Sequence, residues 1–266
     1  MGNTIFSEIC NSTFNKLFKN AKETNQTQFL TSFFSFGEIH GQSTLSYISD
    51  YEFAEVLELL NNFNPLQTSN EINIKDKVRI QMFLYCHIIE VDLIYHILFN
   101  MIQTIKRQSY SPDIFSIRKK KSKNGEKGSK KIAKYPIDKI KVLKVESDKF
   151  EMPLDKVFSE FYSNTLRNAF NHSQYFVEQD GTFNVSQSLS QFSQGNARGH
   201  YPAEAISHFY QKSLTYIKTF INSYKSHIKE FMDGEAYDTN FGKIEYSIPI
   251  HNGWGFKKYD NTTLPI

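Results

Sequence analysis

The segment that most constrains the fold is residues 75–107, where apolar side chains recur at helical spacing from Val78 and Met82 to Ile105. A helix of about 30 residues is about 45 Å long. Because it is apolar on most sides, we expect it to lie deep in a helical bundle. Residues that would be costly at bilayer depth interrupt the run: His87, Glu90, Asp92, His96 and Asn100. The segment therefore predicts a bundle core and no insertion into a membrane.

Three further helices are predicted from apolar periodicity and from the residues that begin and end helices. They are expected at about residues 51–62, 153–172 and 202–232. Pro153 and Pro202 suit the first turn of a helix. The Asn- and Pro-containing stretch 61–65 is expected to end the first of these helices, and Asp233-Gly234 the last.

A β-hairpin is predicted between the last two helices. Asp180-Gly181 separates the alternating stretches 175–177 and 182–185, and Asp-Gly in that position is a strong hairpin signal. A loop is expected at 186–200, and weak alternation at 137–145 predicts a short strand. The predicted fold class is mainly α, a helical bundle with a small β-hairpin and a basic insert.

The chain is expected to be built around one large domain, which its 266 residues allow. Residues 1–45 are polar and show no clear period, so we expect an extension with some short packed pieces. The predicted division is an N-terminal extension at 1–49, a helical domain at 50–232 with an insert at 108–150, and a tail at 233–266 packed on that domain.

Several classes of protein are disfavoured by what the sequence lacks. Cys10 and Cys86 are the only cysteines, too few for a disulfide framework. Residues 1–30 contain no uninterrupted apolar stretch typical of a signal peptide, so we expect a cytoplasmic protein. The sequence has no Gly-x4-Gly-Lys, Cys-x-x-Cys, His-Glu-x-x-His or Gly-x-Ser-x-Gly motif. We therefore expect no cofactor and no metal.

Two polar pairs within the long apolar segment leave one metal-binding alternative open. His87 and Glu90 lie about one helical turn apart, as do Asp92 and His96, and such pairs can ligate a metal ion. The simpler interpretation is that they are polar groups paired inside a helical core.

The stretch most informative about chemistry is residues 166–173. With 100° per residue, Asn168 and His172 fall about 20° on either side of Phe161, on the stripe predicted to be buried. Buried polar groups are costly unless paired, so a polar pocket, a partner chain or a substrate is expected to face them. The alternative is that both bond to other helices and that Arg167 pairs with a carboxylate such as Glu160.

The hexapeptide Arg167-Asn168-Ala169-Phe170-Asn171-His172 resembles the Arg-x4-6-His motif of the HEPN superfamily, in the form with Asn directly after Arg. The context is similar as well, because a long apolar helix precedes the motif helix and a Tyr-rich hairpin follows it. The similarity covers roughly residues 50–232. Asn171 departs from the Ala that usually precedes the motif His, and neither the first 45 residues nor the basic insert has a counterpart.

This resemblance implies a helical domain that forms homodimers, in which two motif helices meet across a two-fold axis and build one composite cleft. Many members are metal-independent endoribonucleases, often toxins or phage-defence proteins. It therefore implies an RNA substrate, a second copy of the chain, and an antitoxin or regulatory protein as a further partner. Other members are inactive and serve as binding modules.

The predicted catalytic residues are Arg167, Asn168 and His172. Without a metal, the 2′-hydroxyl of RNA must lose a proton to attack the adjacent phosphorus, and histidine exchanges protons near neutral pH. Arg167 can hold the phosphate, while Asn168 orients His172 or the phosphate. Arg167 and His172 lie about 140° apart around the helix, which two helices in a dimer would reconcile. A non-catalytic module that binds nucleic acid or protein is the second interpretation. An unrelated bundle, with metal bound through His87 and Glu90, is the third.

The net charge of +3 conceals an asymmetry along the chain. From Arg118 to Lys144 there are 12 basic and two acidic residues, a net charge of +10, whereas the rest of the chain carries −7. This segment is best suited to attract a polyanion, and the planar fork of arginine fits phosphate. The candidate RNA-binding residues are Lys119, Lys120, Lys121 and Arg198. The alternative is a solvated, charged linker.

Replacing Lys119, Lys120 and Lys121 together with Ser is expected to weaken RNA binding at low salt. The slope of log K against log salt should flatten by roughly two, because each phosphate contact on a single strand contributes about −0.7. Binding titrations over a range of salt measure this slope. Turnover at saturating RNA should stay at the wild-type value, and an unaltered slope would identify the segment as a charged linker.

Overall fold

The computed structural model describes residues 2–32, 35–39, 42–46, 48–109, 115–118, 130–133, 135–185, 199–229, 236–239 and 242–245. Its helices are α1 (Asn3–Thr24), α2 (Gln26–Thr31), α3 (Ile48–Thr68), α4 (Ile74–Ile89), α5 (Asp92–Ile105), α6 (Pro136–Asp148), α7 (Leu154–Phe161), α8 (Asn164–Asn171) and α10 (Ala203–Lys229). Its strands are β1 (Ser35–Ile39), β2 (Gln42–Ser46), β3 (Ser116–Arg118), β4 (Lys130–Ile132), β5 (Tyr175–Val177), β6 (Phe183–Val185), β7 (Gly199–Tyr201), β8 (Ala236–Thr239) and β9 (Gly242–Glu245). The prediction of a mainly α fold with a small hairpin is confirmed.

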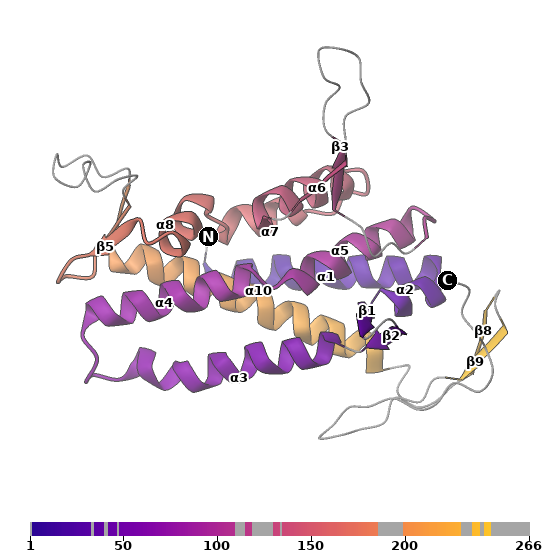
Figure 1. The fold of residues 1–266 in the computed structure, drawn as a ribbon, viewed down its shortest axis with the longest axis horizontal. Helices are drawn as coiled ribbons and strands as arrows, with labels where there is room; N and C mark the ends of the chain where they lie inside the picture. The colour runs from indigo at the N-terminus through magenta and orange to yellow at the C-terminus, as the bar shows by residue number, and fades with distance from the viewer. Residues whose placement is uncertain are drawn as a thin grey trace, which may run out of the picture.

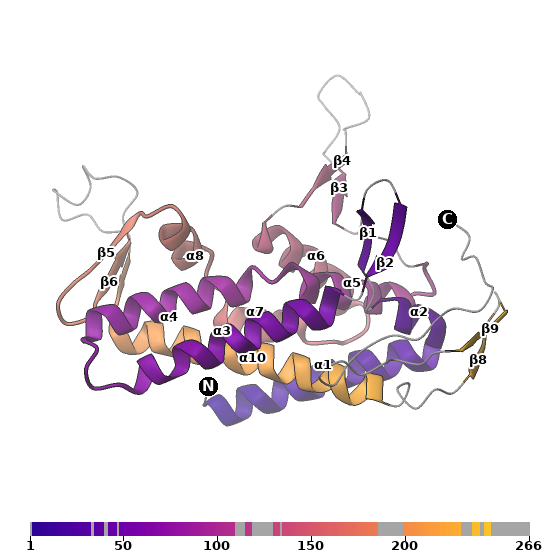
Figure 2. The same cartoon turned by 60° about the horizontal axis from the view of Figure 1, so that its bottom comes forward.

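The long helices run roughly along one axis and form an elongated bundle (Figure 1). α10 packs against α1 and α4, α1 packs against α5, and α3 lies beside α4. α6, α7 and α8 follow one another along one edge of the bundle in Figure 1, and Figure 2 shows α3 and α4 side by side. Contacts of α6 with α5, of α7 with α10 and of α8 with α4 attach this edge to the core.

The hairpin predicted around Asp180-Gly181 is confirmed, because β5 pairs antiparallel with β6. Gly181 has φ +88°, a conformation that glycine adopts without strain. The sheet also has a third strand, β7, which pairs with β6 where the sequence predicted a loop as far as residue 200. Three residues are too few to show a period, which explains why β7 was missed.

The N-terminal segment differs from its prediction, because α1 is a 22-residue helix whose inner face lies in the core. Its buried residues follow helical spacing: Phe6, Cys10, Thr13, Phe14, Leu17, Phe18 and Ala21. The ring centroid of Phe14 lies 5.3 Å from that of Phe220 in α10, and the two rings meet edge to face. The expectation of an extension with some short packed pieces is therefore wrong for this part of the chain, which forms a long core helix.

The long helix predicted at 75–107 is divided at Glu90 and Val91, so that α4 and α5 are separate helices. Val91 has extended backbone angles, and Asp92 begins α5. The hydroxyl of the buried Tyr95 donates a hydrogen bond of 2.7 Å to the carbonyl of Ile89. This bond satisfies an orphan carbonyl at the end of α4. Because no Gly or Pro marks the break, the sequence pattern does not reveal it.

The motif helix predicted at 153–172 is divided as well, between α7 and α8. The hydroxyl of Tyr85, in α4, donates to the carbonyl of Phe161 (3.0 Å) and accepts from the backbone amide of Ser163 (2.8 Å). Burial raises the pKa of this phenol well above its ordinary value, so it stays protonated and can donate. Ser163 then caps α8 by accepting a bond from the amide of Leu166.

Two other predictions are wrong: the end of the first predicted helix and the type of the element at 137–145. α3 continues through Pro65 to Thr68; a proline there removes one backbone bond near the end of the helix, and Ser69 still donates to the carbonyl of Pro65. The strand predicted at 137–145 is instead helix α6. Its buried residues recur at helical spacing: Pro136, Lys139, Ile140, Leu143 and Ser147.

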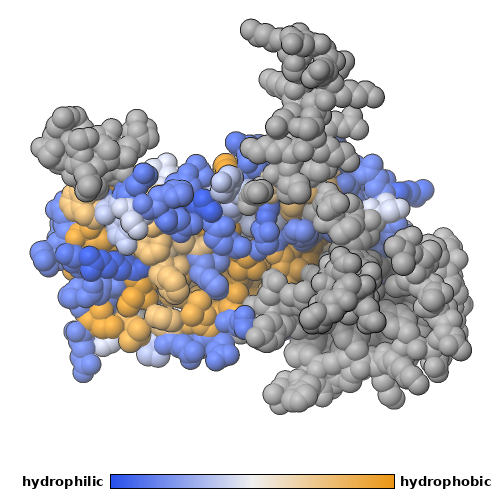
Figure 3. Space-filling model, in the orientation of Figure 1, coloured by the Kyte–Doolittle hydropathy of each residue, from blue (hydrophilic) through white to orange (hydrophobic). Residues whose placement is uncertain are grey.

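Two apolar features of the helices complete the description of the fold. Apolar side chains reach the surface over α3 and α4 (Figure 3), where Leu66, Ile74 and Phe83 are exposed. By length and composition alone, Ile74–Ile105 could cross a membrane, but 72% of its most apolar window is buried inside the protein. A mostly buried apolar segment is compatible with a soluble protein.

Candidate functional site

The motif residues lie on α8, which buries a different face from the one predicted for a continuous helix at 153–172. The buried residues of this helix are Leu166 and Ala169. Asn168 is half-buried and His172 is exposed, so the prediction that both continue the buried stripe of Phe161 is wrong. The physical reason is the break at Tyr162 and Ser163, which ends the helical phase of α7 and starts a new one.

Arg167 is held by Glu90, at the end of α4. Its Nε donates to Oε1 of Glu90, and its NH2 group forms an ion pair with the same oxygen. NH1 donates to Oδ1 of Asn168 at 3.0 Å, and Nδ2 of Asn171 donates to Glu90 at 3.3 Å. The side chain of Arg167 is only 12% exposed, whereas that of Glu90 is 36% exposed. Glu90 therefore joins two of the motif side chains.

An aromatic ring covers one face of the Arg167 guanidinium. Cζ of Arg167 lies 5.6 Å from the ring centroid of Tyr135, the residue that precedes α6, within the range of a cation–π interaction. Burial disfavours the charged guanidinium, but the hydrogen bond and attraction of Glu90 outweigh it, so the pKa of Arg167 is raised. Arg167 is a fixed, charged group.

Glu90 could not be identified as the partner of Arg167 from the sequence. It is the C-cap residue of α4, where the helix dipole disfavours an anion unless a cation lies nearby. Arg167 supplies that cation from a position 77 residues further along the chain. The predicted alternative partner, Glu160, pairs instead with Lys212 of α10.

His172 stands at the end of the motif helix. It is the C-cap residue of α8, and its backbone amide donates to the carbonyl of Asn168 at 3.0 Å. Ser173 follows with φ +54°, which ends the helix. Within the described part of the chain, the imidazole makes no hydrogen bond or ion pair, and nothing joins it to Arg167. One chain therefore presents an exposed His172 and a separately anchored Arg167.

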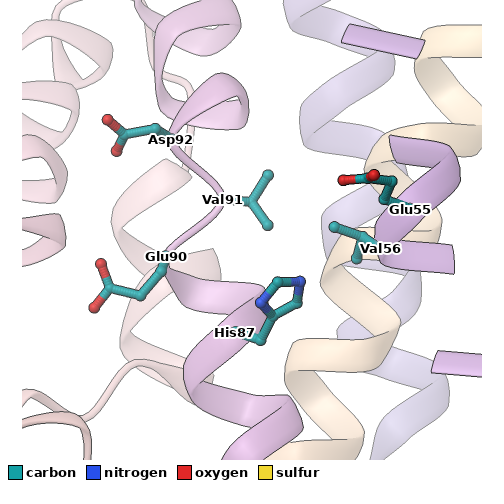
Figure 4. Close-up of a pocket in the computed structure, with 6 residues that line it drawn as sticks. All are labelled: Glu55, Val56, His87, Glu90, Val91 and Asp92. Carbon is teal, nitrogen blue, oxygen red and sulfur yellow. The ribbon is translucent and has the colours of Figure 1, made fainter. Parts of the chain in front are cut away.

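Three of the four residues considered for metal binding line a pocket of about 380 Å³ between α3 and the α4–α5 break, and the fourth, His96, does not. Its lining residues are Glu55, Val56, His87, Glu90, Val91 and Asp92. Figure 4 shows the carboxylates of Glu90 and Asp92 turned away from His87. Asp92 pairs with Lys139, and burial lowers the pKa of His87 despite the opposing charge of Glu55. Among the residues that the structure describes, no three His, Cys, Asp or Glu side chains form a metal-binding group.

The other predicted site residues cannot be placed relative to α8. Lys119, Lys120, Lys121 and Arg198 lie outside the described residues. The strands that flank the first three, β3 and β4, pair antiparallel with each other.

Replacing Arg167 with Ala is expected to lower the free energy of unfolding by about 1–2 kcal/mol, because a partly buried charged hydrogen bond is lost. Glu90 is exposed enough to be hydrated again, which limits the loss. Arg79→Ala is a matched control, since its ion pair with Asp76 is exposed and should contribute less than about 0.5 kcal/mol. Urea denaturation of both variants measures the difference, and equal losses would contradict a structural role for the Arg167–Glu90 pair.

Comparison of the chain with protein-family models, with curated proteins and with solved structures gave no match.

Proposed function

We propose that the protein is a metal-independent endoribonuclease of toxin or phage-defence type that acts as a homodimer. The observation that carries the proposal is the arrangement of α8: an anchored arginine, and five residues later an exposed histidine at the end of the same short helix. This is the Arg-Asn-x3-His pattern in which the chain resembles the HEPN superfamily. A rigid cation and an accessible acid–base group are the two components that RNA cleavage by its own 2′-hydroxyl needs.

Arg167 is the residue proposed to bind the scissile phosphate. A guanidinium has five N–H donors; the contacts with Glu90 and Asn168 use one each on Nε, NH2 and NH1. One donor on NH1 and one on NH2 remain, and these two can bind phosphate oxygens. Because Glu90, Asn168 and Tyr135 already hold the guanidinium, little reorganisation is needed when charge develops on the phosphate.

His172 is the residue proposed to transfer the proton. An imidazole can both accept and donate a proton, so His172 can accept the proton of the 2′-hydroxyl and return one to the leaving oxygen. Its exposure at the end of α8 leaves the imidazole accessible to a polymer. Asn168, which accepts a bond from Arg167, is proposed to orient the guanidinium rather than His172.

Dimerisation is proposed to bring Arg167 of one copy to His172 of the other. The two residues are separately held within one chain, and a two-fold axis beside α8 reconciles them. Light scattering at micromolar concentration is expected to give twice the mass of one chain. Mixing Arg167→Ala with His172→Ala protein should restore cleavage, because each mixed dimer retains one intact pair. A monomer, or a mixture without activity, would contradict the composite site.

The test of the proposed function is incubation of the purified protein with end-labelled RNA in EDTA. We expect internal cleavage that persists in the chelator, with 2′,3′-cyclic phosphate at the new ends, and loss of that cleavage in His172→Ala. Activity that disappears with EDTA, or that is unchanged in His172→Ala, would overturn the assignment.

One observation favours a second candidate, a non-catalytic module that dimerises and binds nucleic acid or protein. Glu90 already compensates the charge of Arg167, which weakens the attraction of the guanidinium for a phosphate. The same experiment separates the two candidates, because the module would leave the RNA uncleaved in EDTA.

A further inference from the structure

Tyr135 is an exposed aromatic residue whose ring lies next to the guanidinium of Arg167. One face of its ring lies against that group, with Cζ 5.6 Å from the centroid, yet the residue is 54% exposed. Exposed rings of this size are few among the described residues; besides Tyr135, the large exposed aromatics are Phe83 and Phe176. Tyr135 thus combines contact with the candidate phosphate-binding residue and a surface open to a ligand.

The position of Tyr135 is determined by the first turn of α6. The residue is the N-cap of that helix, and its carbonyl accepts bonds from the amides of Asp138 and Lys139. α6 also packs against α7, which leads directly into α8. The ring is therefore held beside Arg167 by the backbone of the first turn of α6 and by the packing of α6 on α7.

We infer that Tyr135 is a stacking platform for one base of a single-stranded RNA, which it places beside Arg167. The inference rests on the proposed function and names the form of its substrate. An exposed ring gains by stacking on a base, and every base has a face that fits. Bases of a duplex are stacked inside the helix and cannot reach the ring.

The charge of the segment that precedes Tyr135 along the chain fits a single strand as well. Lys130 and Lys131, in β4, precede Tyr135 by five and four residues and belong to the segment that carries a net charge of +10. Basic residues that follow a phosphate backbone, combined with an aromatic ring that stacks on a base, are the usual components of a single-strand site. A base on Tyr135 has its adjoining phosphate within reach of the guanidinium on the other face of the ring.

Fluorescence of 2-aminopurine in a short single-stranded RNA tests the inference directly, because stacking on a ring quenches it. The measurement uses full-length His172→Ala protein in EDTA, so that no cleavage interferes, and adds Tyr135→Ala, Tyr135→Leu or Tyr135→Phe to it. We expect quenching on binding to His172→Ala protein and to its Tyr135→Phe form, and no quenching with Ala or Leu. The Kd should rise about tenfold for Ala and Leu, and stay within about twofold for Phe.

Phe83→Ala, at an exposed ring on the α3 side of α4, is the matched control and should change neither quenching nor Kd. Leucine at position 135 can still cover Arg167 but has no aromatic ring. If the only role of Tyr135 is to pack on Arg167, the Tyr135→Leu form should therefore show the same quenching and the same Kd as the parent His172→Ala protein. That result, or equal effects on double-stranded RNA, would overturn the inference. Quenching that depends on Tyr135, found together with a wild-type protein that cleaves no RNA in EDTA, would support the platform and reject the enzyme.

Discussion

A His172→Ala protein is expected to cleave RNA at least about 10²-fold more slowly than the wild type, the lower end of the range for a lost acid–base group. It should unfold at the same urea concentration as the wild type. Its imidazole is exposed at the end of α8 and makes no hydrogen bond or ion pair within the described residues, so its removal leaves the packing unchanged. Single-turnover cleavage of labelled RNA in EDTA and urea denaturation measure the two effects.

The matched control is His208→Ala, because His208 is also exposed but lies on α10 beside Lys212 and Glu160. Its cleavage rate should equal that of the wild type. Arg167→Ala differs from both, since it should lose activity and stability together. Wild-type cleavage by a folded His172→Ala protein would remove His172 from the mechanism.

The largest expected effect on stability comes from the first helix. Phe14→Ala is expected to lower the free energy of unfolding by about 3–5 kcal/mol, the usual loss when a buried phenylalanine is truncated. Phe14 is fully buried, and its ring contacts Tyr216 at 5.7 Å and Phe220 at 5.3 Å between centroids. Denaturation by urea, followed by circular dichroism, gives the free energy of unfolding.

Ile5→Ala is the control for this prediction, because Ile5 lies on the same helix and is 53% exposed. Its effect should remain within about 0.5 kcal/mol. A small loss for Phe14→Ala would mean that α1 contributes little to the core and that the first 49 residues behave as the predicted extension.

The sequence was most informative where one period or one strong turn signal continued without interruption. The helix expected at 202–232 and the hairpin around Asp180-Gly181 have the predicted types and nearly the predicted bounds. α1 was missed because Cys10 and Thr13 occupy buried positions, while Asn, Ser and Thr on its other face are poor helix formers. Its apolar period was therefore weak, and packing against α10 stabilises the helix.

The sequence named Arg167, Asn168 and His172 as candidate site residues but did not predict their geometry. The order of Arg167, Asn168 and His172 could be read directly, whereas their exposure depends on the break before α8. That break depends on the hydroxyl of Tyr85, a contact across 76 residues that no local pattern reveals. Glu90 was missed as a partner for the same reason, because the α4–α5 break that positions it carries no Gly or Pro.

Tyr85 limits the ways in which this sequence can diverge. A phenylalanine there would keep the ring but leave the Phe161 carbonyl and the Ser163 amide without their partner, at a cost of about 1–3 kcal/mol for each buried group. A continuous helix through 161–163 would remove that need but change the direction in which Arg167 leaves α8. In related chains we therefore expect the hydroxyl at position 85, the carboxylate at 90 and the guanidinium at 167 to be inherited or lost as a set.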